Sequence, residues 1–176
     1  MALSLYQATI AQYLQLLPAA VANLDRAEAW AGEQRISAED MLGKRIAPDM
    51  WSFATQIRQV VHHSAGALKG AAAGAFSPDV DQGLYDFATL RTLLTDAIAY
   101  LESLDEAALD AIAGNEVAFS FGGQVRMRFV AEDFLLSFSQ PNFYFHASMI
   151  YAILRGLGVS IGKRDFLGKP RIIQPA

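Results

Sequence analysis

The spacing of apolar residues constrains the fold of this chain more than any other feature of its sequence. Over most of the 176 residues, apolar side chains recur at intervals of three and four, which is the period of an α-helix that buries one face. The pattern stops where glycine, proline or a capping residue occurs, as expected at helix boundaries. It predicts long helices over residues 4–32, 50–73, 86–103 and 131–157, a short helical turn after Ser37, a short helix over 105–112 and an irregular tail over 160–176.

Proline and small residues predict local features inside these helices. Pro18 and Pro141 each remove a backbone donor and crowd the preceding turn, so we expect a kink near each of them. Asp49 follows Pro48 and is expected to cap the second long helix. The later part of that helix, residues 65–73, consists mainly of alanine and glycine, which predicts close approach of another helix.

Between Val117 and Val130 the apolar period changes from helical to two. Apolar residues alternate with small or polar ones on both sides of Gly122 and Gly123, a pattern typical of a β-hairpin. This segment carries the only strand signal in the sequence. The simplest packing is therefore an all-α fold, an antiparallel four-helix bundle with a small β-hairpin before the last long helix.

The composition predicts one domain with an apolar surface. A chain of 176 residues has the size of a single domain with one hydrophobic core, so we expect one domain over residues 1–176. Hydrophobic residues make up 53%, mean hydropathy is +0.22, and only 18% of residues are charged. Either the core is unusually full or a partner covers part of the surface. We expect a homodimer.

Several classes of function are disfavoured by composition. The sequence has no cysteine, so it offers no disulfide, no thiolate nucleophile and no cysteine-ligated metal. A net charge of −4 without a basic run lacks the electrostatic footprint of a nucleic-acid binder. The longest uncharged apolar stretch, residues 134–154, contains Pro141 and polar residues and predicts a buried, kinked helix rather than a membrane span. Because Met1–Tyr6 do not resemble a signal peptide, we expect a cytoplasmic protein without a membrane or nucleic-acid partner.

The segment Pro141–His146 carries the candidate binding site. Asn142 and His146 are four residues apart, so on a helix they share one face, with Cβ atoms about 5–6 Å apart. Their amide and imidazole could converge on one small-molecule ligand. Tyr144 and the other aromatic residues of this segment could line a pocket, or could belong to the core or to a subunit interface. His63, on the second long helix, completes the set of pocket candidates.

Sequence order also shows a resemblance that covers nearly the whole chain. The loop Arg45–Met50, the hairpin residues Phe119–Gly123, the segment Pro141–His146 and the closing Gly162–Gly168 together resemble an uncharacterised bacterial family, a domain of unknown function. That family is similar to the DinB/YfiT-like superfamily of proposed metalloenzymes. The resemblance implies the superfamily's helical bundle and assigns no reaction.

The superfamily implies a divalent metal, nickel or zinc, held by three histidines. One comes from the second helix and two, spaced i and i+4, from the fourth. His146 matches one fourth-helix ligand, and either Asn142 or Ile150 then occupies the place of its partner. Neither residue is a normal ligand for such a metal, because a neutral amide oxygen binds it weakly. The resemblance therefore predicts a chain without an intact three-histidine site.

The second-helix ligand is either His62 or His63. His63 lies nearer to the apolar face, by about 20°, and neither faces the core squarely. A metal held by His63 and His146 would need a further ligand, such as Asp49, Asp133 or water. We therefore expect no cofactor, with nickel or zinc as the possible alternative.

Two functions remain open. In the first, the chain is a DinB-like helical bundle of unknown activity that dimerises and binds a small hydrophobic molecule or a protein. In the second, it is a DinB-like metal-dependent enzyme, a thiol-dependent transferase or hydrolase, with a degenerate site at His63, Asn142 and His146.

The closing motif also has two interpretations. Lys163, Arg164 and Asp165 could bind an anionic substrate, or could belong to a solvated tail that Phe166 and Leu167 anchor. We favour the anchored tail.

Overall fold

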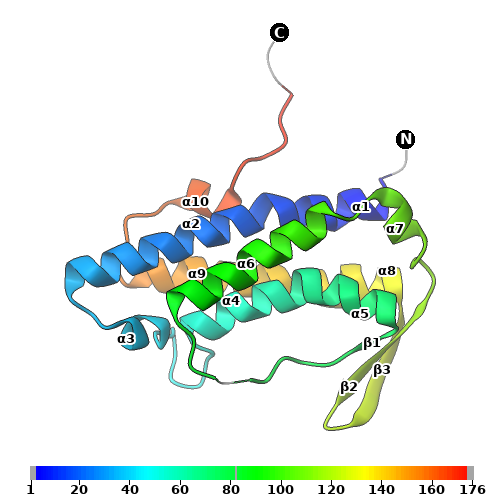
Figure 1. Cartoon of the computed structure of the whole chain (residues 1–176), viewed down its shortest axis with the longest axis horizontal. Helices are drawn as coiled ribbons and strands as arrows, with labels where there is room; N and C mark the ends of the chain where they lie inside the picture. Colours follow the sequence, from blue (N-terminus) through cyan, green and yellow to red (C-terminus); the bar gives the residue numbers. More distant parts are fainter. Residues whose placement is uncertain (1–2, 82, 174–176) are drawn as a thin grey trace.

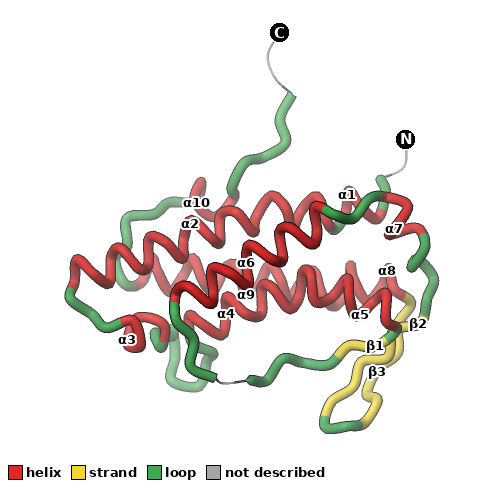
Figure 2. Tube along the Cα trace, in the orientation of Figure 1, coloured by secondary structure: helices red, strands yellow, loops and turns green. Residues whose placement is uncertain are grey.

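The computed structural model describes residues 3–81 and 83–173, which are mostly helical and carry one small sheet (Figure 2). The α-helices are α1 (Leu5–Ala8), α2 (Ile10–Gln34), α3 (Ala38–Leu42), α4 (Phe53–Val61), α5 (Ala67–Ala73), α6 (Phe87–Glu102), α7 (Glu106–Asp110), α8 (Ala131–Asp133), α9 (Gln140–Gly156) and α10 (Lys163–Leu167). The remaining elements are the π-helical segments η1 (His62–Gly66) and η2 (Phe134–Ser139) and the strands β1 (Ala75–Phe76), β2 (Glu116–Phe121) and β3 (Gln124–Val130).

The long helices lie side by side, with α2 packed on α6 and α4 packed on α9 (Figure 1). Both of these pairs run antiparallel, as expected. However, α4 and α6 run in the same direction, because the connection after β1 returns along the outside of the molecule before α6 begins. Purely antiparallel packing was therefore wrong for this pair. A long connection makes the parallel arrangement possible where a short turn would not.

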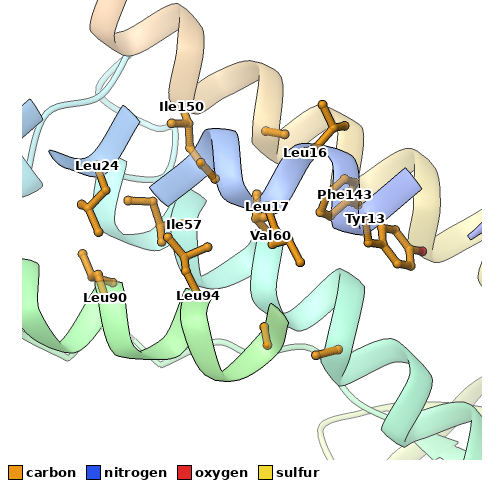
Figure 3. Close-up of a cluster of buried hydrophobic side chains, with 14 of the residues drawn as sticks. Tyr13, Leu16, Leu17, Leu24, Ile57, Val60, Leu90, Leu94, Phe143 and Ile150 are labelled. Carbon is orange, nitrogen blue, oxygen red and sulfur yellow. The ribbon is translucent and has the colours of Figure 1, made fainter. Parts of the chain in front are cut away.

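The core lies between these helices (Figure 3). Tyr13 of α2 and Phe143 of α9 are fully buried, with ring centroids 4.7 Å apart in an edge-to-face arrangement. Leu90 and Leu94 of α6 contribute the apolar face that the sequence predicted for this helix. The helical spacing of apolar residues thus identified the buried faces correctly.

The second long helix begins later than predicted. Ser52, not Asp49, is its N-cap, because the Ser52 hydroxyl accepts a hydrogen bond from the Thr55 amide at 3.3 Å. The Phe53 amide donates to the Lys44 carbonyl at 2.7 Å, which ties the preceding loop to the helix start. Asp49 lies in that loop, exposed to solvent.

The predicted hairpin is confirmed, and it belongs to a three-stranded sheet of order β1-β2-β3. Gly122 and Gly123 both have positive φ, +59° and +74°, as a tight hairpin turn requires. The sequence missed β1, which pairs in parallel with β2 and has only two residues, too few to show a period. The small residues of α5 are approached by this strand: a Cβ on Gly70 would lie 2.9 Å from the Phe76 ring.

Three helix predictions need correction. The first helix is broken at Thr9 into α1 and α2, and α2 continues through Pro18. The second and fourth long helices each contain a π-helical segment, η1 and η2. The tail, expected to be irregular, contains α10.

The α-helices within residues 3–81 and 83–173 are too short or too polar to cross a membrane.

Candidate functional site

Two buried histidines from different helices lie next to each other. His63 belongs to η1 and His146 to α9, and their side chains are 6% and 5% exposed. Their rings are nearly parallel, at 17°, with centroids 5.8 Å apart. The structure thus decides which of the adjacent histidines turns inward. His62 is only half-buried, and its Nε2 donates to the Ser77 carbonyl at 2.9 Å.

Gln56 determines the tautomer of His146. The Gln56 Nε2 atom donates to the Trp51 carbonyl at 3.2 Å, and a carbonyl can only accept. The Gln56 Oε1 atom is therefore the one facing His146 Nδ1, at 2.7 Å, and it must accept. His146 consequently carries its proton on Nδ1, which leaves a lone pair on Nε2.

Ser139 determines the tautomer of His63 in the same way. The Ser139 hydroxyl donates to the His63 carbonyl at 3.0 Å, which uses its single proton. The contact of 3.4 Å between His63 Nδ1 and Ser139 Oγ is then a weak hydrogen bond donated by the imidazole. Both histidines therefore present Nε2 as a hydrogen-bond acceptor.

The π-helical segments explain why these groups meet. A π-helical turn adds a residue to the helix and shifts the residues around it, and such turns are frequent at functional sites. In η1 the shift accompanies burial of His63, and in η2 it accompanies burial of Ser139. Pro141 is the second residue of α9, two positions after the end of η2, and it lacks a backbone N–H, which favours a departure from regular α-helix in the preceding turn.

Burial keeps both imidazoles neutral. Removal from water lowers the pKa of His63 to about 3, with smaller contributions from His62 and His146. Burial likewise lowers the pKa of His146 to about 4. Burial is also the largest cause of the lowered pKa of His62. The pair is therefore uncharged near neutral pH.

Two predicted pocket residues do not face this pair. The Asn142 amide donates to the Phe138 carbonyl of its own helix at 2.7 Å, so it does not converge with His146 on a ligand. Tyr144 is two positions before His146, about 200° away around the helix, and its ring packs against Phe143 at 5.6 Å. The sequence placed these residues on one helix correctly and overestimated how many would share one pocket.

Gln56, Ser139 and Trp51 are the site residues that sequence reasoning missed. Gln56 could have been found, because it is three residues after Phe53 and four before Val60 and therefore lies on the same apolar face. A polar residue on such a face needs a buried partner. Ser139 and Trp51 gave no comparable signal.

A cavity of about 210 Å³ lies next to three residues that contact His146, namely Trp51, Gln56 and Phe145. The Trp51 ring is stacked on the His146 ring at 5.5 Å and 16°, and the Phe145 ring meets it edge-on at 5.2 Å. The cavity thus borders residues that pack on His146, and neither His63 nor His146 is part of its lining. It is lined by Asp49, Met50, Trp51, Gln56 and Phe145.

The donor set does not fit a three-histidine metal centre. His62 faces the loop at Ser77, and the Asn142 position is an amide already bonded to its own helix. In the part of the chain that the structure describes, no group of three or more histidine, cysteine, aspartate or glutamate residues is arranged to hold a metal ion. Asp49 and Asp133 therefore do not complete such a centre with His63 and His146.

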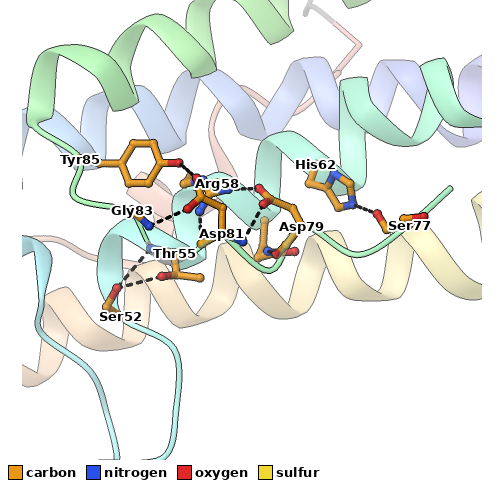
Figure 4. Close-up of polar contacts among 10 residues, drawn as sticks. Ser52, Thr55, Arg58, His62, Ser77, Asp79, Asp81, Gly83 and Tyr85 are labelled. Carbon is orange, nitrogen blue, oxygen red and sulfur yellow. Dashed lines mark hydrogen bonds and ion pairs between the residues drawn. The ribbon is translucent and has the colours of Figure 1, made fainter. Parts of the chain in front are cut away.

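A second polar cluster attaches the connection between β1 and α6 to α4 (Figure 4). Arg58 is 7% exposed and forms an ion pair with Asp79, and Asp81 is 3.7 Å away. The Arg58 guanidinium also lies 4.5 Å from the centre of the Tyr85 ring. These contacts hold the connection against the helix that carries His62 and His63.

The closing motif packs against α2, in agreement with the anchored-tail interpretation. Asp165 accepts from the Gly162 amide at 2.7 Å and pairs with Arg26 of α2, and these contacts lower the pKa of its carboxyl. Gln15 of α2 donates to the Leu167 carbonyl at 2.9 Å. The motif therefore docks α10 onto α2.

Comparison with known families gives the classification. A family model described as a domain of unknown function (DUF1993) matches residues 5–167. The chain belongs to this family. The DUF1993 chain is also similar to a solved structure described as a DinB family member protein from Shewanella denitrificans, with 26% sequence identity, coverage of 97% of this chain and 96% of that one, and a TM-score of 0.81. No curated protein matches it. The DinB-like resemblance seen in the sequence is confirmed, and the family assigns no activity.

Proposed function

We propose that this DUF1993 protein binds a small molecule in the cavity next to Trp51 and Phe145, and that the two imidazoles of the His63–His146 pair are neutral hydrogen-bonding groups of the protein interior rather than metal ligands. The four long helical stretches, α2, α4–α5, α6 and η2–α9, form the DinB-like four-helix bundle that holds the pair.

The observation that carries this proposal is that the amides around His146 form hydrogen bonds within the protein. Gln56 uses its amide N–H and its oxygen on Trp51 and His146, and Asn142 uses its amide N–H on Phe138. The place of a second fourth-helix histidine is thus held by a neutral amide, whose oxygen is a weak ligand for nickel or zinc. The cavity lined by Trp51 and Phe145 supplies a space in which a ligand could contact residues that pack on His146.

A metal-dependent enzyme is the second candidate, and one observation favours it. Metal-bound histidines usually donate their other ring N–H to a nearby oxygen, as His63 and His146 both do through Nδ1. Two neutral imidazoles with free Nε2 lone pairs are chemically competent ligands. In this case His63, Asn142 and His146 would form the degenerate site of a thiol-dependent transferase or hydrolase.

Metal analysis separates the two candidates. We expect protein from nickel- and zinc-supplemented medium to carry well under one equivalent of either metal, and its melting temperature to stay unchanged after chelation. His63→Gln and His146→Gln variants test the pair, with His62→Gln as the matched control on the neighbouring residue. One equivalent of metal that is lost in the first two variants and retained in the third would establish the enzyme candidate instead.

We also propose that the protein forms a homodimer. The proposal is supported by exposed apolar side chains on and beside the hairpin, including Phe121 at 53% and Val125 at 49% exposure. Light scattering at micromolar concentration should give twice the chain mass of 19.1 kDa. A monomer mass would contradict the dimer. The cytoplasmic location expected from the sequence stays a prediction.

A further inference from the structure

The cavity beside His146 combines exposed aromatic rings with one carboxylate. Trp51 and Phe145 each pack on His146, and they remain 36% and 50% exposed to solvent. Asp49 completes the lining from the loop before α4. Aromatic faces attract cations through their quadrupole, and a nearby carboxylate adds direct charge attraction.

We propose that this cavity binds a small organic cation of the quaternary or alkylated ammonium class. The inference rests on the proposed function and names the chemical class of its ligand. A cation is favoured over an anion because Asp49 is the only charged residue among the described residues that line the cavity.

The neighbouring charged groups agree with this choice. His146 lies under the Trp51 ring and is neutral, since burial keeps its pKa far below 7. Arg45 belongs to the same loop as Asp49, but it lines other cavities and directs its guanidinium to the Pro48 and Gly43 carbonyls. A cation in the cavity would therefore meet one carboxylate and no competing positive charge in the lining.

The site is also held in place before a ligand arrives. The Trp51 carbonyl accepts from Gln56, and its ring is stacked on His146, so both ends of this residue are fixed. Little side-chain entropy would then be lost on binding. A volume of about 210 Å³ is below the range of drug-sized sites and suits a headgroup of a few heavy atoms.

Tryptophan fluorescence tests the inference directly. The chain has two tryptophans, so a Trp30→Phe parent leaves Trp51 as the only reporter. Choline is titrated at constant ionic strength, and its uncharged carbon analogue 3,3-dimethylbutan-1-ol serves as the probe of equal shape. We expect saturable quenching by choline, with a half-saturating concentration about tenfold lower than that of the alcohol.

Variants then assign the contacts. Asp49→Asn and Phe145→Leu should each raise the half-saturating concentration of choline about fivefold, and Glu39→Gln, an exposed acid on α3, should leave it unchanged. Equal binding of choline and the alcohol would contradict the proposed preference for a cation, and the proposal of small-molecule binding would still stand. If neither probe quenches the fluorescence, the proposal that this cavity binds small organic ammonium ions is wrong. One equivalent of bound nickel or zinc in the metal analysis would instead contradict the proposed function, in which the histidines are not metal ligands.

Discussion

Lowering the pH from about 7 to about 5 will destabilise the protein by about 4 kcal/mol through His63 and His146. Both imidazoles are neutral and buried in the folded protein, with pKa values lowered from 6.5 to about 3 and about 4. In the unfolded chain they titrate near 6.5, so between these values the unfolded state binds more protons than the folded state. Stability is therefore fully present above pH 6.5 and falls as the pH drops toward the folded pKa values.

The magnitude follows from the same linkage. At about pH 5 each histidine is almost fully protonated when unfolded and mostly neutral when folded, which costs about 2 kcal/mol for each. Urea unfolding at several pH values measures the effect. Because carboxylates also begin to titrate in this range, the comparison must be made against a His63→Gln/His146→Gln double variant.

That double variant should show a much shallower loss of unfolding free energy between about pH 7 and about pH 5 than the natural chain. Single variants should fall between the two. If all the pH profiles run parallel, the pair is charged or accessible in the folded protein, and the assignment of two neutral, buried imidazoles is wrong.

Replacing Gly168 with alanine will destabilise the protein by about 3 kcal/mol. Gly168 ends α10 with φ +66° and ψ −139°, a backbone conformation that residues with a Cβ rarely adopt. A Cβ at this position would also lie 2.3 Å from the Gln15 carbonyl oxygen of α2. That neighbour is helix backbone, which cannot move aside without displacing α10 from α2.

Gly158→Ala is the matched control. Gly158 also has positive φ, +87°, and an added Cβ there would meet nothing within 4 Å. Its cost should be backbone strain alone, about 1 kcal/mol. Urea unfolding of both variants separates the cost of backbone strain from the cost of the clash between the new Cβ and the Gln15 carbonyl. Equal losses would show that close packing of α10 against α2 contributes little, and that the closing motif stabilises only its own turn.

Features with a local cause were predictable from the sequence. Gly122 and Gly123 marked the hairpin, because a tight turn needs the positive φ that glycine adopts easily. Ser37 was recognised as a cap, and its hydroxyl accepts from the Asp40 amide at 3.0 Å. Each of these features depends on residues close together in the chain.

Features that depend on distant partners were not predictable in the same way. Whether His62 or His63 turns inward depends on η1, which packs against α6 and α9. The neutral tautomer of His146 depends on Gln56, which is ninety residues earlier in the chain. Asn142 looked like a site residue because helix geometry places it near His146, but its own helix supplies a nearer acceptor.

By itself, the sequence determined the helical class, the hairpin, the apolar faces and the family. These features depend on apolar periodicity, turn residues and the order of motifs, which can be read from residues close together in the chain. Only the tertiary structure decided the candidate site. Burial lowers the pKa of each histidine, and contacts between separate helices select each tautomer. Packing of Trp51 and Phe145 around His146 then leaves a cavity with one carboxylate. The lowered pKa values, the tautomers and the cavity all depend on contacts that exclude water between segments far apart in the chain. A local sequence pattern therefore could not predict them.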